Sequence, residues 1–227
     1  MNDSISDALN TVRERIRNAV AESGRSADAV QLLAVSKTKP ASSIRAAYAH
    51  GQRLFGESYL QEALAKQHEL ADLDIEWHFI GPIQSNKTRE IATHFSWVHG
   101  VDRLKIAQRL SDQRPHDQSP LNVLLQVNVS GEASKSGVAL ADAEALAIQI
   151  AALPNLRLRG LMTVPAPCHD PQQQRAPFRK LREMKERFGR VGLELDTLSM
   201  GMTDDLESAI AEGATIVRIG TAIFGAR

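Results

Sequence analysis

Lys37 directly follows an apolar run in the segment LLAVSKTKP (32–40), and the run is typical of a buried strand. A lone lysine in this place ordinarily caps the strand and reaches water. At the edge of a core, however, partial desolvation and cationic neighbours lower the pKa of a lysine, so that its free amine reacts more readily. Lys37 is therefore a candidate nucleophile for a carbonyl compound, if other residues supply the rest of a site.

Small residues and hydroxyl groups gather in two later segments, SMGMTDD (199–205) and RIGTAIFG (218–225). Either segment alone is typical of a tight turn with an N-cap hydroxyl. At the ends of the last two strands of a barrel, the same pair is typical of a phosphate site, because hydroxyl and backbone N–H groups donate to an anion. The candidate donors are Ser199, Gly201, Gly220 and Thr221.

An amine and a phosphate site together indicate pyridoxal 5'-phosphate, whose aldehyde forms a Schiff base with a lysine and whose phosphate needs donors. Arg218 lies two residues before Gly220 on the same predicted strand. An arginine only donates hydrogen bonds. If Arg218 faces the pyridine nitrogen, that nitrogen accepts and stays unprotonated, which makes the ring a weak electron sink. A strand-end ion pair is the alternative role for Arg218.

Alternating strand and helix patterns position these residues. An apolar stripe of Leu9, Val12, Ile16 and Val20 predicts an N-terminal amphipathic helix. Eight segments are candidate strands: QLLAVS (31–36), QRLFGE (52–57), EWHFIG (76–81), SWVHGV (96–101), LNVLLQVNV (121–129), LRLRGLMTV (156–164), LDTLSMG (195–201) and TIVRIGT (215–221).

This alternation predicts an α/β fold with a parallel sheet. Eight strands in 227 residues favour a (β/α)8 TIM barrel, one domain over residues 1–227, extended by the N-terminal helix. A doubly wound open sheet is the alternative. The segment PAPCHDPQQQRAP (165–177) is predicted to be a long loop after the sixth strand, followed by a helical pattern over 178–188.

Composition narrows the class of protein. Lys+Arg and Asp+Glu are both 27, and this balance argues against a general nucleic-acid binder. The single cysteine, Cys168, excludes a disulfide within the chain and suits a reducing compartment. No stretch approaches the about 20 apolar residues of a membrane span. A cytoplasmic protein without membrane or nucleic-acid partners is expected.

Over nearly its whole length the chain resembles the YggS/PROSC family of pyridoxal-phosphate-binding homeostasis proteins. The segments that carry the resemblance are LLAVSKTKP, FGESYLQEA, WHFIGPIQSNK, VHGVDR, EASKSG, GLMTVP, LSMGMTDDLESAI and GATIVRIGTAIFG.

The resemblance implies the alanine-racemase N-terminal barrel, called fold type III, with pyridoxal 5'-phosphate held as an aldimine on Lys37. It implies that Ser199, Gly201, Gly220 and Thr221 hold the phosphate and that Arg218 meets the ring nitrogen. It also implies a role in intracellular cofactor homeostasis, with apo-enzymes that depend on pyridoxal phosphate as possible recipients. The family usually has asparagine where this chain has Ser58, so a cofactor contact there is open.

Other residues near strand ends are weaker candidates. His78, Met162 and Asn86 are placed to line the cofactor ring, although each type is more often a core residue or a helix cap. Lys135 is either a solvated loop lysine or a second amine that receives the cofactor during transfer.

Two enzymes are alternatives to a non-catalytic carrier. An alanine-racemase-type enzyme would need a tyrosine four residues after the lysine, where this chain has Ala41, and a second base. It would also need a C-terminal β domain, which is not expected here, so that the chain is expected to be a monomer. A sugar-phosphate enzyme would need paired carboxylates or a metal, and Glu57 and Asp102 are scattered.

Overall fold

The computed structural model describes residues 2–131, 136–168 and 170–226. In chain order its elements are α1 (Asn2–Glu22), β1 (Gln31–Val35), α2 (Ala41–Ala49), β2 (Leu54–Glu57), α3 (Leu60–Glu69), β3 (Glu76–Phe79), the 3-10 helix η1 (Ser85–Lys87), α4 (Thr88–His94), β4 (Trp97–Val101), α5 (Leu104–Gln113), β5 (Leu121–Asn128), β6 (Val138–Ala139), α6 (Ala143–Ala151), β7 (Leu156–Met162), α7 (Pro171–Arg190), β8 (Thr197–Ser199), α8 (Leu206–Ala211), β9 (Ile216–Ile219) and α9 (Thr221–Phe224).

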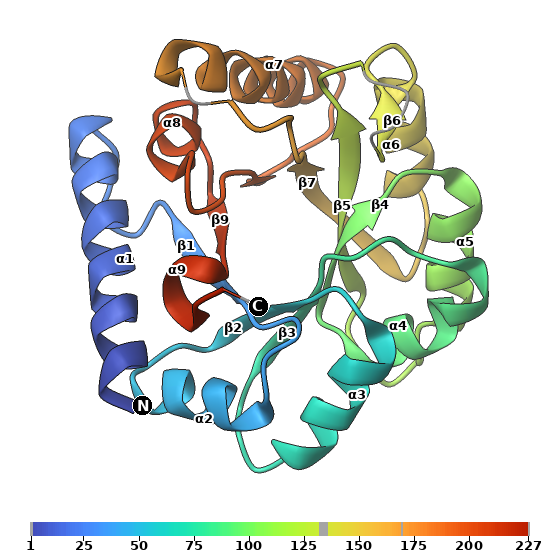
Figure 1. The fold of residues 1–227 in the computed structure, drawn as a ribbon. Helices are drawn as coiled ribbons and strands as arrows, with labels where there is room; N and C mark the ends of the chain where they lie inside the picture. Colours follow the sequence, from blue (N-terminus) through green and yellow to red (C-terminus); the bar gives the residue numbers. More distant parts are fainter. Residues whose placement is uncertain (1, 132–135, 169, 227) are drawn as a thin grey trace.

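The strands form a closed parallel barrel. Their order is β4-β3-β2-β1-β9-β8-β7-β5, and a further pairing of β4 with β5 closes the ring. Figure 1 shows these strands around the centre of the molecule with the helices outside them. The predicted (β/α)8 barrel and its eight strands are confirmed, and the open sheet is excluded. The short strand β6, which pairs with β5 alone, was not predicted.

Helix α1 packs on the outside of the barrel against α2, α8 and α9. Its predicted apolar stripe is buried, since none of Leu9, Val12, Ile16 and Val20 is more than 6% exposed. The helix ends at Glu22, and Gly24 just beyond it has a φ of 66°, which glycine adopts without steric cost.

The hydrophobic core lies mainly between the strands and the surrounding helices. Strands β7 and β8 approach closely at Gly160, where a Cβ atom would meet the carbonyl oxygen of Thr197 at 1.8 Å. Inside the barrel, the separate apolar cluster is small: Trp97, Leu124 and Met162. Much of the remaining interior is therefore open to polar side chains.

The prediction of a long loop over 165–177 is wrong in its second half. Helix α7 begins at Pro171, and the carboxylate of Asp170 caps it by accepting from the N–H of Gln172 at 2.9 Å. Proline is favourable in the first helical turn, where its missing N–H has no partner to lose. The proline- and glutamine-rich composition thus marks a helix start rather than a continued loop.

Candidate functional site

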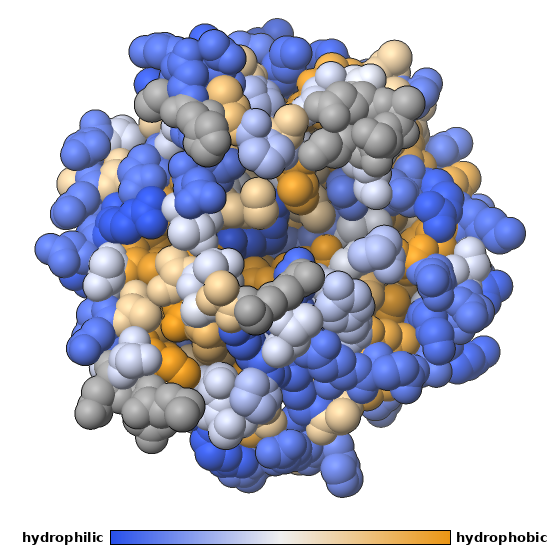
Figure 2. Space-filling view, viewed as in Figure 1, coloured by the Kyte–Doolittle hydropathy of each residue, from blue (hydrophilic) through white to orange (hydrophobic). Residues whose placement is uncertain are grey.

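A cavity of about 330 Å³ opens at the carboxyl end of the strands. Most of the predicted site residues line it, and they come from distant parts of the chain: Lys37, Ser58, Met162, Arg218, Gly220 and Thr221. The rest of the lining is Val35, Ile80, Val164, Met202, Thr203 and Asp204. In Figure 2, hydrophilic and hydrophobic residues meet in a hollow near the centre of the face that carries α9. The volume lies within the range of ligand pockets, about 300–1,000 Å³.

Lys37 lies two residues beyond the end of β1 and is half-buried in the wall of this cavity. It makes no hydrogen bond or ion pair with any residue in the described part of the chain. The following residue, Thr38, has a φ of 64°, a conformation that is rare for a β-branched side chain. The Thr38 N–H donates to Oε1 of Glu62 at 2.5 Å, which holds this strained turn.

Beneath this turn lies a buried ion-pair cluster that the sequence analysis missed. The Lys66 ammonium donates to the Ser36 carbonyl oxygen at 2.8 Å and to Glu57 Oε1 at 2.8 Å. It also donates to Oε1 of Glu62 at 2.5 Å. Ser36 Oγ donates to the same oxygen of Glu57 at 2.6 Å. The cluster fixes the backbone immediately before Lys37.

Burial raises the pKa of the Glu57 carboxyl, and hydrogen bonds from Lys66 and Ser36 oppose that rise. Within the described residues, Glu57 Oε2 has no hydrogen-bond partner. Glu57 was considered above only as a scattered carboxylate for an enzyme of another class. Its partner here is Lys66, and the Glu62–Lys66 spacing of four residues along a helix was the one sequence signal for the cluster.

Arg218 lies on β9 with its side chain buried and its guanidinium at the cavity. Nη1 donates to Ser199 Oγ at 2.8 Å, and Nη2 donates to the Thr163 carbonyl oxygen at 2.9 Å. Burial lowers the pKa of Arg218 to about 10, and the charge of Asp205 opposes this. The guanidinium thus stays protonated near neutral pH and brings a fixed positive charge to the cavity.

The wall next to Arg218 is made by the loop after β8 and by the start of α9. Gly201 has a φ of 95°, and a Cβ atom there would meet Ala209 Cβ at 2.6 Å, so glycine is required for the turn. Asp205 Oδ1 then accepts from the Met202 N–H at 2.6 Å. Together these contacts present Thr203 to the cavity, and the sequence analysis missed this hydroxyl.

Four predicted ligand-binding residues do not line the cavity, and one of them, Asn86, lies in the 3-10 helix η1. Ser199 is buried behind it and bonds to Arg218, while Gly201 shapes the loop without facing the opening. His78 is buried in the barrel interior between His99 and Glu76. The side chain of a strand residue points inward or outward by turns, so position near a strand end does not fix its depth in the barrel. Lys135 lies outside the described residues.

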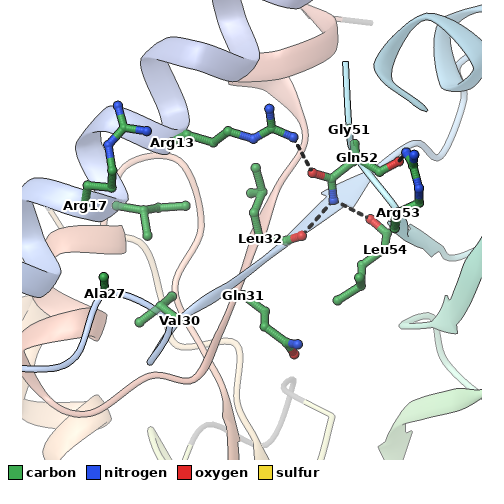
Figure 3. A pocket seen from close by; sticks show the side chains of 11 residues that line it. Arg13, Arg17, Ala27, Val30, Gln31, Leu32, Gly51, Gln52, Arg53 and Leu54 are labelled. Atoms are coloured by element: carbon green, nitrogen blue, oxygen red, sulfur yellow. Dashed lines mark hydrogen bonds between the residues drawn. The ribbon is translucent and has the colours of Figure 1, made fainter. Parts of the chain in front are cut away.

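A second cavity of about 400 Å³ lies at the amino end of the strands, next to α1. Figure 3 shows Arg13 reaching from α1 to Gln52, with Arg17 and Arg53 also at the pocket. None of the residues singled out from the sequence for chemistry lines it. The described residues contain no group of three or more acidic, histidine or cysteine side chains placed to hold a metal. Among their helices, none is long and apolar enough to cross a membrane.

The chain is similar over nearly its whole length to a known protein family and to named bacterial proteins. The family model of the alanine racemase N-terminal domain matches residues 8–227. A Pseudomonas aeruginosa protein named pyridoxal phosphate homeostasis protein is 64% identical over 224 residues, covering 99% of this chain and 96% of that protein. The Escherichia coli K12 protein of the same name is 54% identical over 235 residues, covering 100% of this chain and 98% of that protein.

The solved structure of PipY from Synechococcus elongatus, with pyridoxal phosphate bound, has the same fold. The TM-score is 0.86 at 38% identity, and the match covers 97% of this chain and 100% of that one.

Proposed function

This chain belongs to the family of pyridoxal phosphate homeostasis proteins, which carry the alanine racemase N-terminal domain, and from this we propose that it binds pyridoxal 5'-phosphate reversibly through Lys37. The observation that carries the proposal is a lysine amine without a hydrogen-bond or ion-pair partner among the described residues, together with a buried arginine, in one cavity of ligand size. The bound group supplies an aldehyde, with which a primary amine condenses.

The residues of the cavity fit the three parts of this cofactor. Lys37 offers the amine, and Val35, Ile80 and Met162 offer apolar surface for a flat ring. Thr203, Gly220 and Thr221 offer hydroxyl and backbone donors for the phosphate. The first N–H groups of α9 have no partner within that helix and add to these donors. Asp204 is the one carboxylate in the lining, and Lys37 and Arg218 outweigh its charge.

Arg218 sets the state of the ring nitrogen in this proposal. Its guanidinium remains charged at neutral pH and only donates. A ring nitrogen that accepts from it is unprotonated, so electrons from a substrate are poorly withdrawn into the ring. The arrangement favours holding the cofactor over carrying out chemistry with it.

An amino-acid racemase is the alternative, and the lining of the cavity does not favour it. A racemase needs a base on each face of the bound amino acid. Ala41 lies where alanine racemases have a tyrosine, and neither Tyr48 nor Tyr59 lines the cavity. Among the described residues that line the cavity, Lys37 and the Asp204 carboxylate are the groups that can accept a proton, and none is a tyrosine. We therefore propose a carrier that supplies apo-enzymes in the cytoplasm; its monomeric state stays a prediction.

Reduction with borohydride tests the anchor. The protein is loaded with pyridoxal phosphate, its visible absorbance is recorded, and the reduced protein is mapped by peptide mass. We expect a Schiff-base band and a cofactor mass on the peptide that contains Lys37. Lys37→Ala should lose the band and keep the fold. The matched control is Lys39→Ala, since Lys39 lies in the same turn but donates to the Ala226 carbonyl oxygen outside the cavity.

A modified Lys39, or a band that survives in Lys37→Ala, would overturn the assignment of the anchor. A parent protein that stays colourless with added cofactor would overturn the binding proposal itself. Turnover of an L-amino acid to its D form by the loaded protein would favour the racemase.

A further inference from the structure

A continuous chain of hydrogen-bonded side chains runs through the inside of the barrel, from the cavity to the opposite end. Arg218 Nη1 donates to Ser199 Oγ at 2.8 Å, and Ser199 Oγ lies 2.9 Å from His99 Nδ1. His99 Nε2 lies 2.9 Å from His78 Nδ1. His78 Nε2 lies 2.9 Å from Glu76 Oε1. The five residues come from β9, β8, β4 and β3, and we call them the interior relay.

Both ends of the interior relay fix the direction of its hydrogen bonds. At the cavity end, Arg218 only donates, so Ser199 Oγ accepts from it, and the hydroxyl proton of Ser199 is free to be donated to His99 Nδ1. At the other end, the hydrogen bond with His78 lowers the pKa of the Glu76 carboxyl, which is therefore ionised and only accepts. His78 must carry its proton on Nε2. Each imidazole consequently has a bare Nδ1 and a protonated Nε2.

The two imidazoles are neutral links in this chain. Burial lowers the pKa of His78 and lowers that of His99 well below its ordinary value, where the positive charge of Arg218 adds to the effect. Trp97 stacks on His78 with ring centroids 5.4 Å apart and an angle of 4° between the planes, which fixes the plane of that imidazole. The relay therefore joins one cation and one carboxylate through oriented neutral groups.

A barrel interior is ordinarily packed with branched apolar residues. Replacing buried polar groups by apolar ones of similar size is often neutral or stabilising, so stability alone does not account for two histidines here. The relay instead connects two openings. Arg218 faces the cavity at the carboxyl end, and Glu76 lines a separate cavity of about 470 Å³ at the amino end, together with Arg159 and Asp196.

We propose that Ser199, His99, His78 and Glu76 are positioning residues that hold the Arg218 guanidinium in one orientation and stabilise its charge toward the ligand in the cavity. This inference rests on the proposed function for its ligand, pyridoxal phosphate. A polarised chain of hydrogen bonds strengthens each member, so a change at Glu76 is felt at Arg218 without any contact between them. Glu76 thus becomes a determinant of affinity at the far end of the barrel.

Two substitutions in the amino-end cavity separate the relay from a general charge effect. Glu76→Gln removes the carboxylate that ends the relay. Asp196→Asn removes a carboxylate from the same cavity that pairs with Arg159 and lies outside the relay. For Glu76→Gln we expect the dissociation constant of pyridoxal phosphate to rise about threefold, with a shifted visible band, and for Asp196→Asn no change. Ser199→Ala, which removes the direct acceptor of Arg218, should raise it about tenfold.

The free protein gives an independent readout by ¹⁵N NMR. We expect the imidazole resonances to show a bare Nδ1 on both His78 and His99, and Glu76→Gln to shift the guanidinium resonance of Arg218. Equal effects of Glu76→Gln and Asp196→Asn on affinity, or a protonated His99 Nδ1, would overturn the inference. If the parent protein takes up no cofactor, the proposed function fails, and the Arg218 resonance alone decides: a shift in Glu76→Gln supports the relay and no shift refutes it.

Discussion

Lys37 and Lys66 both lie at the end of β1, but their surroundings are opposite. Lys66 is buried and donates to the Ser36 carbonyl and to two carboxylates. Lys37, the residue after Ser36, lines the cavity and has no hydrogen bond or ion pair among the described residues. An ammonium surrounded by acceptors is locked in place, whereas an amine without them remains available to a ligand. The difference separates a structural lysine from a reactive one.

The two lysines are also linked. Lys66 neutralises Glu57, whose second oxygen has no partner in the described part of the chain, and together they hold the backbone of Ser36. That backbone leads directly into the turn at Thr38 and so determines where Lys37 points. The cluster around Lys66 therefore supports the site without touching the cavity, and the contrast between the two lysines can be tested by removing each in turn.

The largest effect is expected for Lys66→Met. Removing one partner of a buried ion pair leaves Glu57 uncompensated, which costs about 3–5 kcal/mol of the free energy of unfolding. Lys37→Met is the matched control and should change that free energy by less than about 0.5 kcal/mol, because it breaks no hydrogen bond or ion pair among the described residues. Denaturant unfolding of both variants measures the difference. Equal losses of stability would mean that the two lysines do not differ in the way described.

Ser36→Ala tests the same cluster at one hydrogen bond. The hydroxyl donates to Glu57 at 2.6 Å, and its loss should cost about 1.5–3 kcal/mol, since the acceptor is a carboxylate with few partners. Ser42, an exposed serine of α2, provides the control Ser42→Ala. Thermal unfolding compares them. A loss no greater than that of Ser42→Ala would show that the serine hydroxyl does not support Glu57.

Much of this organisation is readable from the sequence. Buried strands show as apolar runs, so the barrel and its eight strands follow from the sequence pattern. Lys37 and Arg218 are recognisable because a charged side chain at the end of a core strand is costly to bury unless it pairs with another group or binds a ligand. Gly220 and Thr221 follow the last strand, where a barrel places a phosphate site, and they line the cavity.

The rest of the site could not be predicted from the sequence. It depends on how deep each side chain lies in the barrel and on contacts between residues far apart in the chain, and a local sequence pattern encodes neither. Ser199 ends β8, as predicted, but its hydroxyl points back to Arg218 instead of into the cavity. Thr203, in the loop beyond it, takes the place at the wall. Lys66 donates a hydrogen bond to Ser36, thirty residues away in the sequence, and His78 is hydrogen-bonded to His99, twenty-one residues away. Such contacts appear only once the barrel has closed.

The buried, hydrogen-bonded histidines also make the stability of the protein depend on pH. Burial lowers the pKa values of His78 and His99. At acidic pH the unfolded chain therefore binds more protons than the folded chain. Their contribution to stability is complete above pH ~6.5 and falls as the pH drops below it, by about 1.4 kcal/mol per pH unit for each histidine until its folded pKa is reached. Denaturant unfolding between about pH 5 and pH 8 measures this slope, because that range brackets the pKa of histidine in the unfolded chain, about 6.5.

His99→Asn should remove about half of this slope, because one buried imidazole of the two is gone. The control is His116→Asn, since His116 is exposed, and it should leave the slope unchanged. A pH dependence that is identical in the two variants would mean that folding does not lower the pKa of His99, contrary to its neutral place in the interior relay.

The smallest effect is expected for Thr38→Gly, at the turn that separates the two lysines. Thr38 has a φ of 64°, so glycine relieves backbone strain while retaining the N–H that donates to Glu62. The relief of about 1–3 kcal/mol is partly offset by the greater freedom of glycine in the unfolded chain, about 0.5–1 kcal/mol, which leaves a modest gain in stability. Thermal unfolding measures the gain. The control is Thr93→Gly in helix α4, where glycine should cost about 0.3 kcal/mol relative to threonine.

The same variant shows what the strain at Thr38 does for Lys37. A threonine held in this conformation restricts the turn, and the restriction keeps the amine directed at the cavity. We therefore expect Thr38→Gly to be more stable yet slower to take up pyridoxal phosphate, as followed by visible absorbance. A variant that gains stability and loads at the parent rate would show that the Lys66 cluster alone positions Lys37. A variant that loses stability would show that the turn is unstrained, and Thr38 would then have no part in the difference between the two lysines.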